Sequence, residues 1–375
     1  MRWFKDRHKG EARRNEAGRN KVVKLYGVSG LLALSIALGT SGTDPAVQPG
    51  AGLFLTAAER QTLAAEAVQT GALEEYANFY VVDGCGYAKF DGFSKLTEAV
   101  YAGALNAYAD NLPEDVKLYS MLAPTSAAFT LPTQYAGLFP DQRQIIADVA
   151  GMLDERFISI DIYPTLEAHK NEYLYFRTDH HWTQRAGYLA YTQLAGPLKF
   201  PAYSDKKLNQ CDTGIDFLGS VAAETGSRQL GQNLDRLSYY PIPADVNYVY
   251  WDNTAAPHTY SQGLYKWWYL SQPNKYVFFL GGDLPYIRLK TDAQSGRKIA
   301  VIKDSYANTV IPFLTLHFDE IHIIDPRNSS FNALQIIEEN DIKEVLFVNY
   351  ARVVCLPKFS AGLHQLLTRD YVTWR

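Results

Sequence analysis

The last third of the chain alternates short apolar runs with segments of helical character, and this pattern constrains the fold more than any other feature. Apolar runs separated by helices of roughly ten to fifteen residues indicate right-handed βαβ units and a parallel sheet. The sequence therefore predicts an α/β fold with an open parallel sheet covered by helices on both faces. The expected elements are strands at 298–302, 321–324 and 344–348, with helices at about 306–317 and 331–339.

The same alternation occurs earlier in the chain with less regular segments. Residues 78–90 are expected to form two short strands around a turn at Asp83-Gly84. Thr183 is expected to cap a helix at 184–196, whose apolar residues fall on one face. Further expected elements are helices at 94–112 and 141–153, and strands at 116–123, 157–163 and 173–176.

Composition divides the chain into a short N-terminal part and one long domain. Residues 44–56 are rich in Pro, Gly and small residues, which indicates a linker, and residues 57–77 have helical composition. The folded domain is therefore expected at 57–375, after an N-terminal part at 1–56. Within it, residues 200–295 have little helical periodicity and are expected to form an irregular insertion of short strands and loops.

The N-terminal part has the charge pattern of an export segment. Residues 1–24 hold nine Lys or Arg against three Asp or Glu, a charge of +6, and the next nineteen residues carry no charge. A basic segment followed by an apolar one is typical of a cleaved signal or an uncleaved membrane anchor. The alternative is a basic tail on a cytoplasmic protein. The export interpretation predicts an extracytoplasmic protein, secreted or anchored at the cell surface.

The composition of the remaining residues excludes some classes of protein. The whole chain has a net charge of -4, so the part after residue 24 carries about -10, which argues against binding of nucleic acid. Three cysteines, an odd number, allow at most one disulfide and form no Cys-x-x-Cys metal site. The aromatic residues are numerous enough to stack on sugar rings, although most are expected in the core.

Ser305 is the best candidate for a nucleophile. It lies in the segment KDSYAN, directly after the predicted strand at 298–302. The carboxyl ends of parallel strands are where sites form in open α/β sheets, and the N–H groups of a following helix can stabilise an oxyanion. Equally, Asp304 or Ser305 could serve only as the N-cap of that helix.

A serine needs a base, and Asp179 and His181 can supply one from a single loop. Side chains two residues apart can emerge on the same side of the chain, so that Asp179 holds one ring nitrogen of His181 while the other reaches Ser305. His180, between them, is then expected to point elsewhere and to cap or pack. Trp182 is expected to pack behind the pair.

Several further residues are candidates for oxyanion stabilisation or substrate binding. Asn349 follows the last predicted strand and could donate a side-chain N–H, and the Gly281-Gly282 turn could offer backbone N–H groups. Tyr306 and Trp182, next to the proposed chemistry, are candidates of the same kind. Turns and turn initiation are the usual roles of such glycines and asparagines.

Four segments carry a family resemblance: FRTDHHWTQRAGYLAY, APTSAAFTLP, GRKIAVIKDSYANTVIPFLTLHFDEIHIIDPR and IKEVLFVNY. Together they resemble the DHHW protein family, which is similar to the SGNH-hydrolase-like alginate O-acetyltransferases. The resemblance covers about residues 78–350. It implies an SGNH-like (flavodoxin-like) fold in which Asp179, His181 and Ser305 form a triad, with the Asp-x-His pair preceding the serine in the chain.

The resemblance also implies a reaction and its partners. The expected activity is an O-acetyltransferase or acetylesterase that moves acetyl to or from hydroxyls of a cell-surface or secreted polysaccharide through an acyl-serine. No metal or other cofactor is required. A membrane-bound O-acyltransferase that passes acetyl across the bilayer is the expected partner, in keeping with an N-terminal membrane segment.

Two other functions remain open from the sequence. The letters DHH also name a metal-dependent phosphoesterase family, but those enzymes need further aspartates, for which DIYPTLEAH and HIIDPR offer only isolated candidates. A non-catalytic surface protein on the same fold, binding glycan through the aromatic insertion, is the second alternative, because fold does not establish activity.

Overall fold

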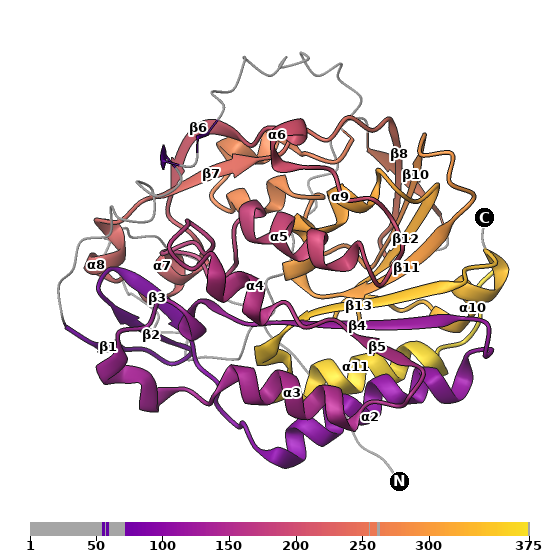
Figure 1. Ribbon diagram of the computed structural model, residues 1–375, viewed down its shortest axis with the longest axis horizontal. Helices are drawn as coiled ribbons and strands as arrows, with labels where there is room; N and C mark the ends of the chain where they lie inside the picture. The colour runs from indigo at the N-terminus through magenta and orange to yellow at the C-terminus, as the bar shows by residue number, and fades with distance from the viewer. Residues whose placement is uncertain (1–54, 57, 60–71, 255, 261–262, 374–375) are drawn as a thin grey trace, which may run out of the picture. The chain divides into compact units, whose positions relative to one another are not determined.

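An eight-stranded sheet forms the centre of the protein in this computed structural model (Figure 1). Its strand order is β5-β4-β13-β11-β12-β10-β8-β9. The first five strands of that order are parallel, and β10, β8 and β9 extend the sheet as antiparallel strands. The strands are β4 (Lys117–Ala123), β5 (Phe157–Ser159), β8 (Val246–Trp251), β9 (His258–Tyr260), β10 (Tyr286–Thr291), β11 (Lys298–Lys303), β12 (Glu320–Ile324) and β13 (Glu344–Tyr350).

The description covers residues 55–56, 58–59, 72–254, 256–260 and 263–373. The predicted export segment, the linker at 44–56 except its last two residues, and most of the helix expected at 57–77 lie outside these residues. Among the residues described, no helix is both long and apolar enough to cross a membrane.

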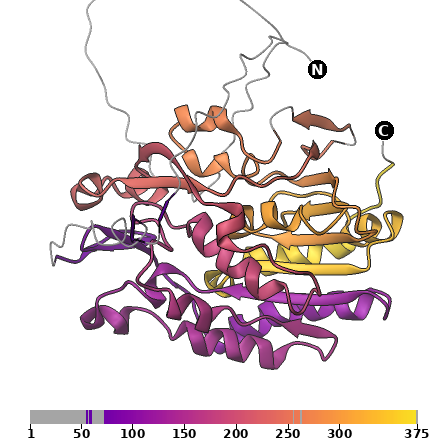
Figure 2. The same cartoon turned by 45° about the horizontal axis from the view of Figure 1, so that its top comes forward.

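Helices cover both faces of the sheet, as predicted (Figures 1 and 2). On one face, Tyr108 of α2 packs its ring against Phe347 of β13 and donates a hydrogen bond to the Leu363 carbonyl of α11. On the other face, Tyr191 of α5 stacks on Phe313 of α9. The longer helices are α2 (Lys95–Asn111), α3 (Gln142–Met152), α5 (Gln184–Leu194), α10 (Ala333–Glu339) and α11 (Pro357–Thr368), whereas α9 (Ile311–Leu314) is a single turn.

The central strand β11 shows why the parallel part of the sheet is apolar. It pairs with β13 on one side and β12 on the other, and all of its residues after Lys298 are buried. A strand covered by helices on both faces needs apolar side chains at successive positions rather than at alternate ones. This continuous run is the pattern that makes the strand visible in the sequence.

Smaller sheets and helices surround the central sheet. The hairpin predicted at 78–90 is present as β2 and β3, and its turn residues Asp83 and Gly84 have φ of 50° and 69°, as a tight hairpin turn requires. The remaining elements are strands β1 (Glu74–Glu75), β2 (Phe79–Val82), β3 (Cys85–Ala88), β6 (Cys211–Phe217) and β7 (Asp235–Tyr239), and helices α4 (Tyr163–Ala168), α6 (Asp205–Leu208), α7 (Ser220–Thr225) and α8 (Arg228–Gly231).

Two expectations about the elements are wrong. The helix predicted at 306–317 is a short 3₁₀ helix, η5 (Ser305–Thr309), followed by the single turn of α9, with Pro312 near its start. Residues 173–176 form no strand, only one bridge between Tyr175 and Trp182.

The region at 200–295 contains the expected short strands and loops, and three of its strands, β8, β9 and β10, extend the central sheet. The three cysteines, of which the sequence allowed at most one pair, are all free thiols.

Candidate active site

The loop that carries Asp179 and His181 is closed like a hairpin. Thr183 N–H donates to the Leu174 carbonyl at 2.8 Å, and Phe176 N–H donates to the His181 carbonyl at 3.2 Å. Trp182 is fully buried behind this loop and donates its indole N–H to the Tyr306 carbonyl at 2.8 Å. The tryptophan therefore ties the loop to η5, the segment of Ser305, across more than a hundred residues of sequence.

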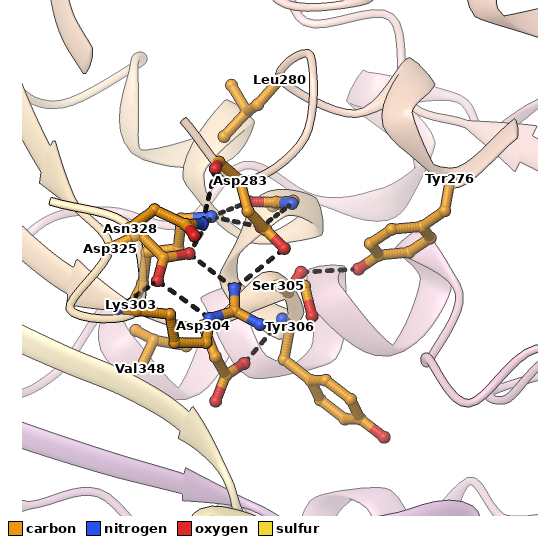
Figure 3. Close-up of polar contacts among 12 residues, drawn as sticks. Tyr276, Leu280, Asp283, Lys303, Asp304, Ser305, Tyr306, Asp325, Asn328 and Val348 are labelled. Carbon is orange, nitrogen blue, oxygen red and sulfur yellow. Dashed lines mark hydrogen bonds and ion pairs between the residues drawn. The ribbon is translucent and has the colours of Figure 1, made fainter. Parts of the chain in front are cut away.

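Asp304 caps η5 and thereby leaves the Ser305 hydroxyl available. The Oδ1 atom of Asp304 accepts from Tyr306 N–H at 2.8 Å, and its Oδ2 atom accepts from Tyr350 N–H at 2.8 Å. Figure 3 shows Ser305 with Asp304 and Tyr306, its neighbours in the chain. Of the two roles that the sequence left open, the cap belongs to Asp304.

Asp179, His181 and Ser305 form a continuous chain of hydrogen bonds. The Nδ1 atom of His181 lies 2.5 Å from Oδ1 of Asp179, and its Nε2 atom lies 2.7 Å from Oγ of Ser305. All three side chains are buried. The arrangement places a base on a serine hydroxyl and a carboxylate on the far nitrogen of that base, which is the geometry of an activated nucleophile.

The Asp179 carboxylate is held in its ionised form. Burial alone would raise its pKa, but the charge of His181 and the hydrogen bond from that ring outweigh burial and bring the pKa below its usual range. Ser220 N–H adds a hydrogen bond to Oδ2 at 2.8 Å, and His181 N–H donates to Oδ1 at 3.0 Å. An ionised Asp179 can therefore orient the imidazole and stabilise its protonated form.

The sequence offered no signal for two residues that position this pair. Gly219 lies so close that a Cβ atom there would be 2.3 Å from the Cβ atom of Asp179, so only glycine fits. Tyr276 stacks its ring on His181 at 3.7 Å between centroids and 6° between planes, and donates to the Ser305 carbonyl at 2.9 Å (Figure 3). Both residues come from the region that sequence analysis treated as an insertion.

The family model described as DHHW protein matches residues 55–324, well over half of the chain and inclusive of both Asp179–His181 and Ser305. The chain belongs to the DHHW protein family. The resemblance expected from its sequence is thereby confirmed. A search of curated protein sequences finds no match.

Solved structures similar to this DHHW protein include a DHHW family protein from Eubacterium siraeum, with 27% identity, a TM-score of 0.69, and coverage of 80% of this chain and 98% of that chain. PatB1 of Bacillus cereus with a sulfonyl adduct matches at 19% identity and a TM-score of 0.63, covering 77% of this chain and 98% of that chain. The O-acetyltransferase domain of Pseudomonas putida AlgJ matches at 12% identity and a TM-score of 0.41, covering 78% and 98%. The first two likenesses, with TM-scores of 0.69 and 0.63, accord with the α/β fold expected from the sequence.

His180 of the DHHW motif does not point away from the site, contrary to expectation. Its ring lies 3.8 Å from that of His181 between centroids, and its Nδ1 atom is 2.8 Å from Oγ of Ser220. Burial and the nearby charge of His181 lower the pKa of His180 to about 3. A neutral His180 therefore packs against the base, and its hydrogen bond goes to Ser220 rather than to Ser305.

The donors predicted for an oxyanion are directed to other acceptors. Asn349 lies inside β13, donates to the Val348 carbonyl at 2.9 Å and accepts from Tyr101 of α2 at 2.8 Å. Gly281 and Gly282 donate their N–H groups to the carbonyls of Val277 and Phe279.

Tyr306, the other predicted polar contact, donates its hydroxyl to the His180 carbonyl at 2.8 Å. Together with the indole bond of Trp182, this hydrogen bond joins η5 to the DHHW loop. Both aromatic residues therefore hold the two halves of the site together. A direct contact to substrate stays a prediction for these five residues, each of which has a hydrogen-bond partner within the protein: Asn349, Gly281, Gly282, Tyr306 and Trp182.

A partly buried charged cluster lies beside Ser305 and was missed by the sequence analysis. Lys303 is fully buried and donates to Asp283 at 2.6 Å, and Arg327 binds Asp325 through two nitrogens and Asp283 at 2.9 Å (Figure 3). Burial raises the pKa of Asp304 to about 6, against the opposing charge of Arg327. Lys303 ends β11, and Asp325 and Arg327 follow β12, so these strand ends meet as the parallel sheet predicts, while Asp283 comes from the loop before β10.

Asp179, His180 and His181 could also be considered as metal ligands. Their potential ligand atoms lie within 4.8 Å of one another, the one such group found among the residues described. Each of these side chains already has a hydrogen-bond partner, and the two nitrogens of His181 are directed at Asp179 and Ser305. Asp325, a further aspartate that the phosphoesterase alternative would use, is bound by Arg327. The donor set fits the serine site better than a two-metal site.

Proposed function

We propose that this protein is a serine-dependent O-acetyltransferase or acetylesterase that acts on a polysaccharide through an acyl-serine intermediate. The observation that carries the proposal is the hydrogen-bonded chain from Ser305 Oγ through His181 to Asp179, with lengths of 2.7 and 2.5 Å. Membership of the DHHW family and an SGNH-like fold support it. The polymer and the balance between transfer and hydrolysis are left open by the proposal.

In the first half-reaction, Ser305 Oγ attacks the carbonyl carbon of an acetyl ester while His181 Nε2 takes the hydroxyl proton. The ester C–O bond then breaks, and His181 returns the proton to the departing alcohol oxygen. In the second half-reaction, a sugar hydroxyl or water gives its proton to His181 and attacks the carbonyl carbon of the acetyl-serine. The bond between Ser305 Oγ and the acetyl carbon then breaks, and His181 returns the proton to Ser305 Oγ. Asp179 remains ionised and stabilises the imidazolium in both steps.

Replacement of Ser305 tests the proposal directly. Ser305→Ala is expected to lower the release of acetate from an activated acetyl ester and from acetylated sugars by about 10⁴-fold or more, because no nucleophile remains. Ser330→Ala, at an exposed serine, is the matched control and should retain wild-type rates. Equal activity of wild type and Ser305→Ala would contradict the proposed chemistry and favour a non-catalytic protein.

A sulfonyl reagent provides a second measurement that needs no substrate. PatB1 of Bacillus cereus, similar in fold, is known with a sulfonyl adduct. A sulfonyl fluoride that reacts with Ser305 would form an oxygen–sulfur bond with loss of fluoride and of the hydroxyl proton. Intact mass should show one adduct on wild type and on Ser330→Ala, and none on Ser305→Ala.

Glycan binding without catalysis has one supporting observation. Trp268, in the region at 200–295, is 64% exposed, and an exposed aromatic ring can stack on a sugar. This function would leave the hydrogen-bonded chain of Ser305 unexplained. The enzymatic proposal accounts for both features, since a polysaccharide enzyme also needs a surface for its polymer.

The proposed location is extracytoplasmic, with a membrane-bound O-acyltransferase as the acetyl source. Its support is the basic and then uncharged N-terminal sequence. Fractionation of cells that express the full chain tests the location, and recovery only in the cytoplasm would contradict it. A membrane-bound O-acyltransferase gene beside this one would support the partner.

A further inference from the structure

A cavity lies apart from Ser305, beside the small N-terminal sheet. It has a volume of about 530 Å³ and is lined by residues of β3, of the loop at 126–134 and of the segment at 170–177. Neither Ser305 nor His181 lines it. A cavity of this size is typical of a site for a small molecule or a single sugar unit. We refer to it as the Arg177 cavity.

Arg177 places an incompletely bonded guanidinium at the wall of this cavity. Its side chain is only 6% exposed, and its Nη2 atom makes no hydrogen bond to any residue that the structure describes. The guanidinium lies 4.9 Å from the ring centroid of Tyr173, which orients it. Burial of a charged group without a hydrogen-bonded partner is unfavourable, so an anionic ligand would compensate for it.

The nearby carboxylates are committed to other donors. Asp235 accepts from Tyr173 hydroxyl, from Thr178 N–H and hydroxyl, and from the backbone N–H of Arg177 rather than its side chain. Glu172 is bound by Arg185 at 2.6 and 3.3 Å. With that pair neutral, the lining carries Arg177 and Lys170 against Asp83, which leaves one positive charge.

The lining indicates the chemical class of the ligand. One guanidinium matches a singly charged carboxylate, which it can bind through two parallel hydrogen bonds, better than a doubly charged phosphate. Ser126 supplies a hydroxyl group, and the ring of Phe129 supplies an aromatic surface. The hydroxyl groups of Tyr87 and Thr130 donate to the carbonyls of Thr130 and Ser126, so toward a ligand they can act as acceptors. Hydroxyl groups and aromatic rings together suit the polar edge and the apolar face of a sugar.

We propose that the Arg177 cavity binds a carboxylate-bearing sugar unit, with Arg177 as the partner of the carboxylate. The assignment of this sugar to the polysaccharide substrate rests on the function proposed above. The segment that lines the cavity ends at Arg177, two residues before Asp179, so the same stretch of chain forms the cavity wall and the start of the DHHW loop. The cavity is thus a substrate subsite that contributes to selection of the polymer and not to acyl transfer.

Calorimetric titration of the full chain at constant ionic strength tests the proposal with three probes. Glucuronate is expected to bind, whereas glucose, which has the same ring without the carboxylate, and acetate, which has only the carboxylate, should bind at least about tenfold more weakly. Arg177→Gln should weaken glucuronate binding by about tenfold or more. Arg369→Gln, at an exposed arginine of the C-terminal region, is the matched control and should bind as wild type does.

Further measurements separate this proposal from folding defects and from the catalytic proposal. Arg177→Lys keeps the charge but not the paired donors, and it should weaken glucuronate binding several-fold with an unchanged circular dichroism spectrum. Ser305→Ala should bind glucuronate like wild type, even if the catalytic proposal fails. Equal binding of glucuronate and glucose by wild type, equal binding of acetate, or unchanged binding in both Arg177 variants would overturn the assignment.

Discussion

The two halves of the candidate active site are positioned in different ways. Ser305 stands at the end of β11, a buried central strand, and its turn is capped by its own neighbour Asp304. Asp179 and His181 stand on a loop without a regular strand, and contacts from Gly219, Ser220 and Tyr276 hold them. The nucleophile is therefore placed by the sheet, whereas the base is placed by side chains from a distant part of the chain.

This difference indicates which part of the site should tolerate substitutions and which part should lose activity when a single residue changes. A turn at the end of a parallel strand is stabilised by the whole sheet, so few single substitutions move it. A loop held by individual contacts loses its geometry when one contact changes, and a displacement of about 1 Å can lower activity by roughly 10²-fold. Substitutions around His181 should consequently reveal more about positioning than substitutions around β11.

The largest expected effect follows removal of the base itself. His181→Ala should lower kcat by about 10⁴-fold or more, because Ser305 then has no group to take its proton. His180→Ala is the matched variant one residue away, and it should retain activity within about tenfold, since His180 bonds Ser220 and only packs on the base. Steady-state hydrolysis of an activated acetyl ester measures both. Equal losses in the two variants would contradict the assignment of His181.

A smaller effect is expected from replacement of Gly219, which packs against the orienting residue Asp179. Gly219→Ala would put a Cβ atom 2.3 Å from Cβ of Asp179, so the loop must shift. We expect kcat to fall by roughly 10²-fold and the free energy of unfolding to fall by about 1–3 kcal/mol. Thermal unfolding and kinetics measure the two changes.

Gly151→Ala is the control for this substitution. Gly151 lies near the end of α3 with nothing within 4 Å of a new Cβ atom, so alanine there should preserve activity and leave stability unchanged or slightly higher. If Gly219→Ala behaved like this control, the loop would not depend on close contact with residue 219. The contrast between the two halves of the site would then be wrong.

The smallest effect concerns acid stability. The pKa of His180 is lowered to about 3 by burial and by the charge of His181, so between about pH 6.5 and pH 3 the unfolded chain binds more protons than the folded one. The contribution of neutral His180 to the free energy of unfolding is therefore fully present above about pH 6.5 and is lost as the pH falls toward 3. His180→Gln should reduce the fall in Tm between pH 7 and pH 4 by a few degrees.

The exposed residue His364 supplies the comparison for this pH measurement. His364→Gln, on α11, should leave the dependence of Tm on pH as it is in wild type. A wild-type profile in His180→Gln would show that His180 is not kept neutral by its packing against His181. In that case the contact between the two rings would not be a determinant of the site.

The parallel part of the fold could be predicted because each of its elements has a local signature. β11, β12 and β13 are runs of consecutive apolar residues, and their ends bring Ser305 and Arg327 to one edge of the sheet. Strands β8, β9 and β10 were not recognised as part of this sheet. β10 pairs with β12, β8 pairs with β10, and β9 pairs with β8, and local sequence does not encode these pairings.

Asn349 shows how a small error in strand length changes a functional prediction. The strand was predicted to end at residue 348, which would leave Asn349 free to face the site, but β13 continues to Tyr350. Successive side chains of a strand point to opposite faces, so the extra residues direct Asn349 toward Tyr101 of α2. The face of the sheet to which a side chain near a strand end points depends on how far the strand pairs with its neighbours, and this pairing is set by the tertiary structure.

The amino-acid sequence was enough to predict the parallel sheet, the DHHW family and the three residue types that a serine mechanism needs. The folded chain was needed to see that Ser305 and His181 meet at 2.7 Å, that Tyr276 and Gly219 position the base, and that Arg177 lines a separate cavity. Periodicity along the chain reports local burial, because it depends on neighbours within one element. Distances between residues far apart in sequence arise from packing of the whole chain, and the chemistry depends on those distances.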